Sequence, residues 1–294
     1  MNLDRLKTFC LVAQNASLLQ AAQKLKLSPA TVSLRLKQLE REIGVPLFEH
    51  KPNRLVLSAK GKVLLAQAQR ILQQIDDSVA LLRDDDEACK GSLSVLVGVD
   101  LAHYLAPRVA SFVEQNPAVN LSVLVSPSPE SLRLILDGQA DIAIGRFLKL
   151  PRWIAALRLF TSTVAAIFPA GHPFAGRTRL SLRDLAAQGL IVPSQYSVTR
   201  RVVHRAFAAQ GLEMRTVLEA GGCSLIREYA QLGLGVGLVH EICVRGKIDG
   251  DLVVRDLERM FGRIDVLLIY RKDRVLTPAH RRFIEALSDR PSSA

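Results

Sequence analysis

The chain has 294 residues, few cysteines and no long hydrophobic run. Its four cysteines, at positions 10, 89, 223 and 243, show no Cys-x-x-Cys spacing, so neither a disulfide framework nor a zinc site is expected. No run approaches the ~20 apolar residues that a transmembrane helix needs. The first residues also lack the basic start and unbroken apolar run of a signal peptide. We therefore expect a protein of the reducing cytoplasm with no membrane partner.

Patterns that indicate catalysis are also missing. The six histidines show no metal-ligand spacing, and no Gly-x-Ser-x-Gly segment occurs. Gly233-x-Gly235-x-Gly237 follows a predicted helix and precedes a predicted strand, the reverse of the order in a phosphate-binding loop, and so indicates a tight turn. No catalytic residue, metal site or cofactor is expected, although a metabolite-processing enzyme remains an alternative.

Positive charge is in excess and unevenly distributed. The chain has 39 Lys and Arg against 28 Asp and Glu, a formal net charge of +11. Residues 1–60 hold ten basic and four acidic residues, a net charge of +6 in about a fifth of the chain. This density predicts that the N-terminal region binds a polyanion. A solvated basic surface is the alternative.

Residues 17–40 are typical of two helices joined by a short turn. Ser17 and Gln20 form a capping-box pattern, and Ser28 precedes Pro29 at the start of the second helix. Helical spacing predicts a buried stripe of Val32, Leu36, Leu39 and Ile43. The outward face then suits a DNA major groove; its residues are Pro29, Ala30, Thr31, Ser33, Leu34, Arg35 and Lys37.

Residues 47–58 follow Gly44, which we expect to end the second helix. Pro52-Asn53 between two apolar runs predicts a short β-hairpin, or wing. Four residues at or beside its tip are expected to reach phosphates or the minor groove: His50, Lys51, Asn53 and Arg54. Each of them alone is more typical of solvated surface.

Residues 59–84 have the pattern of one long helix without an interior proline. Apolar residues recur over much of its circumference, so it needs a partner. The simplest partner is the same helix of a second chain, giving a two-fold dimer that reads two half-sites. The alternative is packing against its own globular domain. Residues 59–90 are predicted to be a dimerisation helix and hinge between a DNA-binding domain, 1–58, and the remaining chain.

Residues 91–294 alternate between strand and helix patterns, which favours parallel sheets. Strands are predicted at 93–99, 119–125, 141–145, 163–168, 190–192, 215–219, 236–239 and 264–270. Helices are predicted at 104–115, 130–136, 182–187, 199–210, 224–232 and 278–287. These elements are too many for one small lobe, so we expect two α/β subdomains around a cleft, about 91–161 plus 266–294, and 162–265.

Ligand groups in such a cleft come from the carboxyl ends of strands and from helix N-termini. Arg146 there could form a bidentate pair with an acidic effector. Asp100 would repel an anion; it could select an amine or be held by Arg146 or His103, and the sequence leaves this open. The candidate effector-binding residues are Asp100, Ala102, His103, Ser126, Ser128, Arg146, Pro193, Ser194, Tyr196, Gly221 and Gly222.

Several motifs resemble the LysR-type transcriptional regulators. They include Ala21-Ala22-x-x-Leu25, Leu27-Ser28-Pro29-Ala30-Thr31-Val32-Ser33, Leu39-Glu40, Leu47-Phe48, Leu57-Ser58, Gly61, Gly91-Ser92-Leu93, Asp141-Ile142-Ala143-Ile144 and His172-Pro173-Phe174. The resemblance implies a winged helix-turn-helix, a dimerising linker helix and a C-terminal periplasmic-binding-protein-like domain, usually in a tetramer. The chain departs from the pattern at Leu34 and His50, where many members have Arg, and at His240-Glu241, near the usual position of a Pro.

The resemblance also implies a function. We expect a transcriptional regulator that binds an inverted repeat in double-stranded promoter DNA as a homodimer or homotetramer. A small-molecule effector, most simply a metabolite, would modulate that binding from the cleft, and RNA polymerase is a candidate further partner. A constitutive regulator whose cleft binds nothing is the alternative.

Overall fold

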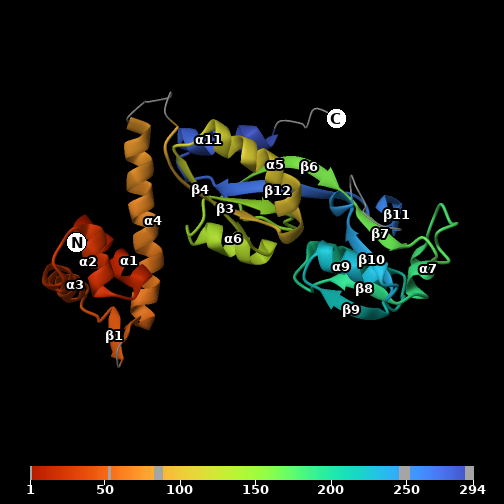
Figure 1. Cartoon of the computed structure of the whole chain (residues 1–294), viewed down its shortest axis with the longest axis horizontal. Helices are drawn as coiled ribbons and strands as arrows, with labels where there is room; N and C mark the ends of the chain where they lie inside the picture. Colours follow the sequence, from red (N-terminus) through yellow and green to blue (C-terminus); the bar gives the residue numbers. More distant parts are fainter. Residues whose placement is uncertain (1, 52–53, 83–88, 245–251, 289–294) are drawn as a thin grey trace. The chain divides into compact units, whose positions relative to one another are not determined.

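The computed structural model describes residues 2–51, 54–82, 89–244 and 252–288. Residues 1–86 form most of one compact unit, and most of the remaining chain forms a second. Within these described ranges, no helix is both long enough and apolar enough to cross a bilayer. The fold confirms the predicted class, an N-terminal winged helix-turn-helix and a two-lobed α/β domain (Figure 1).

The N-terminal unit contains helices α1 (Leu3–Asn15), α2 (Leu18–Leu25) and α3 (Pro29–Ile43). The side chains of Ser17 and Ser28 accept hydrogen bonds from the first turns of α2 and α3, as their positions predict. Gly44 ends α3 with a φ of 78°, a left-handed conformation that glycine adopts without a Cβ clash. Local capping therefore sets the ends of both helices of the helix-turn-helix.

The predicted buried stripe of α3 packs in the core of this unit. Val32 and Leu39 are fully buried there, together with Phe9 of α1 and Ala21 of α2. Phe9 meets Phe48 edge-on, with ring centroids 5.5 Å apart. These contacts hold the two helices at a defined crossing and leave the opposite side of α3 exposed.

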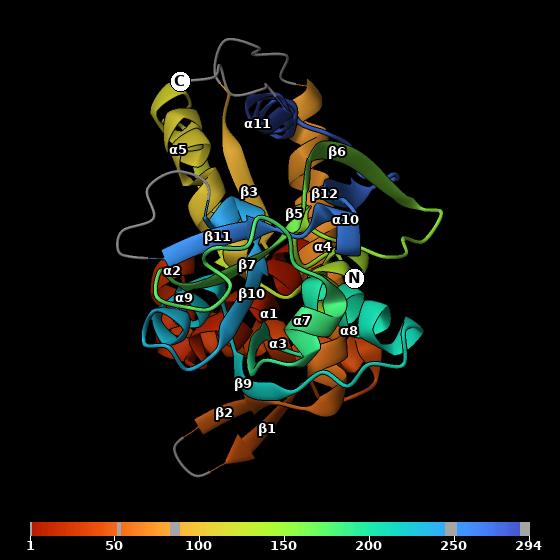
Figure 2. The same ribbon diagram turned by 90° about the vertical axis from the view of Figure 1, so that its right-hand side faces the viewer.

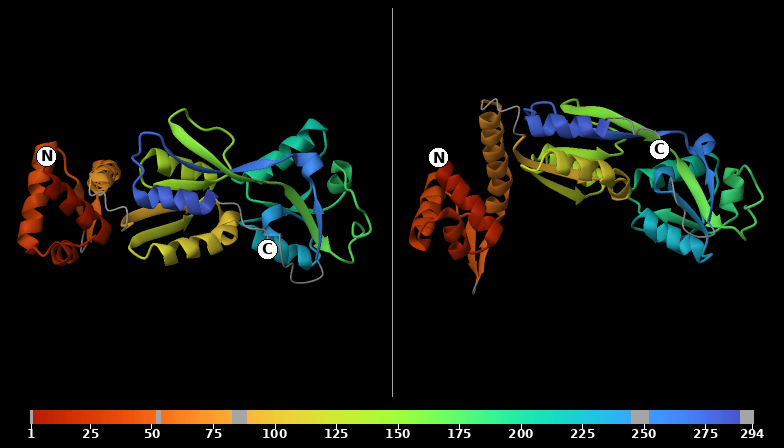
Figure 3. Two further views of the ribbon diagram at one scale, coloured as in Figure 1. Left: turned by 90° about the horizontal axis from the view of Figure 1, so that it is seen from above. Right: turned by 45° about the horizontal axis from the view of Figure 1, so that its top comes forward.

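The wing is an antiparallel hairpin of β1 (Phe48–Lys51) and β2 (Arg54–Leu57), which projects from the helices of this unit (Figures 2 and 3). Ser58 connects it to α4 (Ala59–Leu82): its hydroxyl donates to the Pro46 carbonyl and accepts from the Gly61 N–H, at 2.8 and 2.9 Å. A Cβ on Gly61 would lie 2.1 Å from the Leu47 carbonyl oxygen. The wing and the start of α4 therefore form one closely packed junction that requires glycine.

The apolar residues of α4 divide between two roles. Leu64, Leu65 and Leu72 pack against the core of the N-terminal unit, so packing against its own domain accounts for part of the pattern. Ile71 and Val79 remain exposed. The described part of this helix therefore retains apolar side chains that the chain itself does not cover.

The first lobe of the C-terminal unit is a five-stranded sheet in the order β4-β3-β5-β12-β6. Its strands are β3 (Gly91–Val97), β4 (Val119–Val125), β5 (Ile142–Gly145), β6 (Ile154–Ser162) and β12 (Ile264–Arg271). Helices α5 (Val99–Gln115) and α11 (Pro278–Ser288) cover one face, and α6 (Ser128–Leu136) covers the other (Figure 1). Phe112 and Phe283 join α5 to α11, with ring centroids 5.0 Å apart.

The second lobe has the sheet order β11-β7-β10-β8-β9. Its strands are β7 (Val164–Pro169), β8 (Leu190–Pro193), β9 (Thr216–Ala220), β10 (Val236–His240) and β11 (Leu252–Asp256). Its helices are α7 (Leu182–Ala186), α8 (Val198–Ala209), α9 (Cys223–Gln231) and α10 (Glu258–Phe261), with a short 3-10 turn, η1 (Glu241–Cys243), after β10. Phe168 and Phe207 are fully buried in its core.

Both sheets are mixed, whereas the alternating pattern favours parallel ones. The parallel pairs are β3 with β4 and β5, and β8 with β9 and β10. In contrast, β12 runs antiparallel to β5 and β6, and β7 runs antiparallel to β10 and β11. Only Thr163 separates β6 from β7, so the chain passes from one sheet to the other without the crossover helix that a parallel connection needs.

The passage between lobes is held by side-chain hydrogen bonds. The Ser162 hydroxyl lies 2.8 Å from Nδ1 of the buried His240, and the Thr163 hydroxyl donates to Asp256 at 2.9 Å. Nε2 of His240 is buried and has no hydrogen-bond partner among the described residues. These contacts link β6, β7, β10 and β11 where the two sheets meet.

Candidate functional site

The predicted DNA-reading face of α3 is largely accessible. Pro29, Ala30, Leu34 and Lys37 are exposed, and Thr31 and Ser33 are half-buried. Leu34 is 54% exposed, a high value for a leucine. A face of small, hydroxyl, apolar and cationic side chains can enter a major groove, where Leu34 would contact a thymine methyl group and Lys37 a phosphate.

Two side chains of α3, Arg35 and Glu40, make polar contacts that brace this helix and the wing beside it. Arg35 is half-buried and its guanidinium donates to the Thr8 hydroxyl of α1 at 3.4 Å, so it also braces α3. The Glu40 carboxylate accepts from the backbone N–H groups of Leu47 and Phe48 at 2.7 and 3.3 Å. Glu40 therefore holds the first residues of the wing against the C-terminal half of α3.

Four of the predicted contacts lie in the wing. The backbones of His50, Lys51 and Arg54 belong to β1 and β2, but their side chains, and Asn53 as a whole, lie outside the described part of the chain. Their contacts with DNA stay a prediction.

The cleft of the C-terminal unit contains a cavity of about 80 Å³. Its walls come from loops at the carboxyl ends of β3, β4, β5, β8 and β9, where the strand-end rule places ligand groups. Eight of the predicted effector residues line it: Asp100, Ser128, Arg146, Pro193, Ser194, Tyr196, Gly221 and Gly222.

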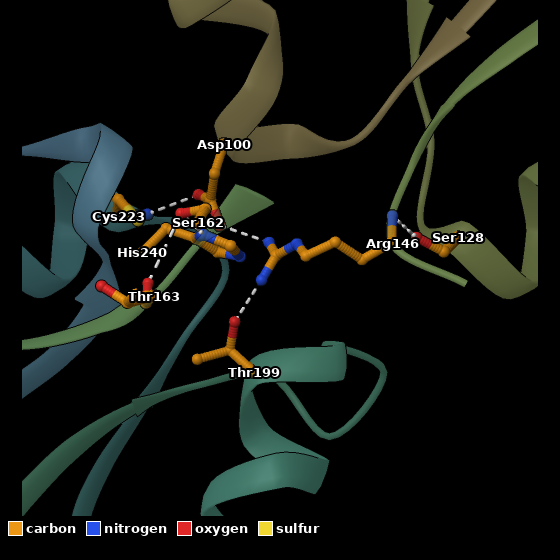
Figure 4. A network of polar contacts seen from close by, with 8 residues as sticks. All are labelled: Asp100, Ser128, Arg146, Ser162, Thr163, Thr199, Cys223 and His240. Atoms are coloured by element: carbon orange, nitrogen blue, oxygen red, sulfur yellow. Dashed lines mark hydrogen bonds and ion pairs between the residues drawn. The ribbon is translucent and has the colours of Figure 1, made fainter. Parts of the chain in front are cut away.

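Arg146 is the central side chain of this cleft (Figure 4). Its guanidinium is buried, donates to the Thr199 hydroxyl of the second lobe, and lies 3.6 Å from the Asp100 carboxylate of the first lobe. Its backbone N–H donates to the Ser128 hydroxyl at 3.3 Å. Burial lowers the pKa of Arg146 to about 10, opposed by the Asp100 charge, so the guanidinium remains protonated at neutral pH.

Asp100 also contacts both lobes. One carboxylate oxygen pairs with Arg146, and the other accepts a hydrogen bond of 2.9 Å from the backbone N–H of Cys223, at the start of α9 (Figure 4). Of the alternatives that the sequence leaves open for Asp100, the structure has the pair with Arg146. We call Asp100, Arg146 and Thr199 the clasp, because their contacts join the two lobes.

Three predicted effector residues do not line this cavity. Ala102 packs against the core of the first lobe. Ser126 is buried, and its carbonyl accepts from the Ser131 hydroxyl at 3.2 Å. His103 is exposed and borders an adjoining cavity of about 360 Å³, which Asp100 also lines. The direct effector role predicted for these three residues therefore has less support than that of the other eight.

Sequence reasoning missed Thr199 and Cys223. Both belong to the first turn of a helix that follows a cleft loop, α8 and α9 respectively. Helix N-termini are a general signal for ligand groups. That signal could have added both residues, but it does not specify their partners across the cleft.

A winged helix-turn-helix joined to two α/β lobes around a polar cleft defines a ligand-responsive DNA-binding protein. Residues 3–62 match the family model of the bacterial regulatory helix-turn-helix protein, lysR family, and residues 88–292 match the LysR substrate binding domain. The chain therefore belongs to the LysR family of transcriptional regulators. It is a DNA-binding regulator with an effector-binding domain, and not an enzyme.

Individual relatives agree with this assignment. The chain is 32% identical to the HTH-type transcriptional regulator CysB of Burkholderia cenocepacia, over 85% of this chain and 81% of that protein. It shares the fold of a full-length OxyR variant from Pseudomonas aeruginosa, with a TM-score of 0.77, 22% identity and coverage of 98% and 93%. Full-length CbnR in complex with its target DNA also matches, with a TM-score of 0.68, 22% identity and coverage of 98% and 99%.

Proposed function

We propose that the chain binds an inverted-repeat operator through the exposed face of α3 and the wing, as a cytoplasmic homodimer or homotetramer. The exposed Ile71 and Val79 of α4 support association through this helix, since a two-fold pair would bury them. The likeness to full-length CbnR, a structure solved in complex with its target DNA, supports DNA binding by this chain. RNA polymerase is the further partner that activation of transcription would require.

We further propose that the effector acts on the clasp. A buried guanidinium that contacts both lobes is the observation that carries this proposal. The cavity of about 80 Å³ beside the clasp is lined by residues of both lobes, so an arrangement in which the lobes stand further apart would enlarge it for a metabolite. A small polar effector that competes for Asp100 or Arg146 would favour that arrangement, and its preference for one arrangement is what couples it to DNA binding.

Selection of binding sites from a random double-stranded DNA library by the full-length chain tests the first proposal. We expect an enriched sequence with two-fold symmetry and an affinity that falls steeply with salt. Enrichment of an unsymmetrical site, or binding insensitive to salt, would contradict it.

A thermal-shift screen of small polar metabolites against the full-length chain tests the second proposal. A true effector should stabilise the chain and change its affinity for the selected operator. The conservative variant Thr199→Val should alter the response to that effector and retain operator binding without it. If no metabolite both stabilises the chain and changes its affinity for the operator, the regulator is constitutive and the proposed role of the clasp is wrong.

A further inference from the structure

Two of the four cysteines, far apart in the sequence, meet at one wall of the larger cavity. Cys223 begins α9, Cys243 ends η1, and Asp100 lies in the first turn of α5. The two sulfur atoms and a carboxylate oxygen all lie within 4.8 Å of one another. All three residues border the cavity of about 360 Å³, which adjoins the small cavity of the clasp, since Asp100 and Gly222 line both. The spacing of the cysteines along the chain gives no hint of this cluster.

Two thiolates and a carboxylate form a donor set that Zn²⁺ prefers over hard cations. Zn²⁺ takes sulfur and carboxylate ligands in tetrahedral geometry, and sites with three protein ligands keep a fourth position for water or a ligand. Mg²⁺ and Ca²⁺ prefer oxygen ligands. Here the cavity beside Cys223 and Cys243 provides room for the fourth position.

The carboxylate of this set is already held in place by groups behind it. The backbone N–H of Cys223 donates to one oxygen of Asp100, and Arg146, itself bonded to Thr199, pairs with the other (Figure 4). Such outer contacts orient metal ligands and are typical of built metal sites. Asp100 would therefore need little reorganisation to bind a cation.

The charges around the cluster also agree with a thiophilic ion. Two thiolates, one carboxylate and a divalent cation sum to one negative charge, which the buried Arg146 offsets. Arg227 also borders the cavity, and these positive groups disfavour ions that bind by charge alone. Without metal, the hydrogen bond with Cys243 and burial raise the pKa of Cys223, so its thiol is protonated. Ligation as a thiolate requires Cys223 to lose this proton, so metal binding is accompanied by proton release to solvent.

We propose that Asp100, Cys223 and Cys243 form a site for one thiophilic divalent ion of the Zn²⁺ class. Asp100 belongs to the first lobe and Cys223 to the second. A bound ion therefore ties the lobes together beside the clasp, and its binding is coupled to whatever arrangement of the lobes the effector favours. The site does not depend on the identity of that effector.

Titration of the reduced full-length chain with Cd²⁺ tests this site. Cd²⁺ reports thiolate ligands directly through its ultraviolet charge-transfer absorption. We expect this absorption to saturate at one ion per chain, and Zn²⁺ to displace it. The conservative variants Cys223→Ser and Cys243→Ser should each weaken Cd²⁺ binding at least about a hundredfold. The control is Cys89→Ser, which replaces a buried cysteine outside the cluster and should leave binding unchanged.

The outcomes are distinguishable from a loss of fold. Cys243 is only half-buried, so Cys243→Ser keeps the test available if Cys223→Ser unfolds the domain. For Cys243→Ser, operator binding and melting temperature without metal should match those of the unchanged chain. Absorption that persists in the double variant Cys223→Ser/Cys243→Ser, or no saturable binding by the unchanged chain, would overturn the proposal.

Discussion

The clasp predicts a measurable coupling between Asp100 and Arg146. At 3.6 Å and an effective dielectric constant of about 20, their attraction is about 5 kcal/mol. Arg146→Met keeps the aliphatic stem but leaves the Asp100 charge without its partner. Asp100→Asn likewise leaves the Arg146 charge without its partner. Loss of one partner of a buried pair typically costs about 3–5 kcal/mol. We therefore expect each single variant to destabilise the C-terminal unit by about that amount.

The double variant is the informative one. It has neither charge buried, so its loss of stability should be smaller than the sum of the two single losses by about 2–3 kcal/mol. Asp100→Asn retains an oxygen that can accept from the Cys223 N–H, so the cycle isolates the charge. Thr199→Val, which removes only a hydroxyl from Arg146, should cost about 1 kcal/mol.

Urea unfolding of the full-length chain measures these values. The single tryptophan, Trp153, lies beside β6 in the first lobe and reports on the C-terminal unit. Operator binding checks that the N-terminal unit is intact in each variant. Additive effects, with a coupling below about 0.5 kcal/mol, would refute the argument that Asp100 and Arg146 stabilise the lobes as a pair.

Three further predictions concern the N-terminal unit. Gly61→Ala should destabilise this unit by about 3 kcal/mol in thermal unfolding, because the new Cβ overlaps the Leu47 carbonyl. The control Gly176→Ala, at an open position, should be near neutral. Equal effects of the two substitutions would contradict the packing of this junction. Lys37→Ala should lower the salt slope of operator binding by about one and weaken binding to all DNA sequences alike. Leu34→Ala should instead relax the base preference at one operator position. A fluorescence-anisotropy titration in which Lys37→Ala changes base preference and Leu34→Ala changes the salt slope would exclude these roles. Val79→Asp should lower the oligomeric state in analytical ultracentrifugation, since a charge would enter the proposed contact between α4 helices, and an unchanged sedimentation coefficient would count against that contact.

The helices of the N-terminal unit could be predicted because their ends depend on neighbouring residues. The hydroxyls of Ser17 and Ser28 make the capping bonds that their positions predict, and Gly44 takes the left-handed conformation that ends α3. The apolar spacing of Val32 and Leu39 also fixes which side of α3 is buried. Such signals need no knowledge of the rest of the fold.

Two strands and the strand directions could not be predicted in this way. β6 contains Ala155, Ala156 and Arg158, which give no strict alternation of apolar and polar residues, and it lies at a sheet edge. β11 is a five-residue edge strand and gives a similarly weak signal. The antiparallel entry of β7 and β12 follows from the passage of the chain between lobes, which is a property of the tertiary fold.

In the cleft, too, some residues could be predicted from the sequence and their partners could not. Arg146 directly follows β5, so the strand-end rule identified it. Its partner Thr199 is 53 residues away along the chain and belongs to the other lobe. Neither that contact nor the meeting of Cys223 with Cys243 leaves a periodic pattern in the sequence.

The junction at Ser58 and Gly61 limits how such a regulator could adapt, during evolution, to operators with a different spacing of half-sites. The hydroxyl of Ser58 ties the wing to α4, and the missing Cβ of Gly61 lets the Leu47 carbonyl pack against the helix. This leaves no compliant joint between the DNA-reading surface and α4. In a dimer joined through α4, adaptation to a different half-site spacing would therefore require substitutions on the dimer-forming face of that helix, while the reading surface itself could stay unchanged.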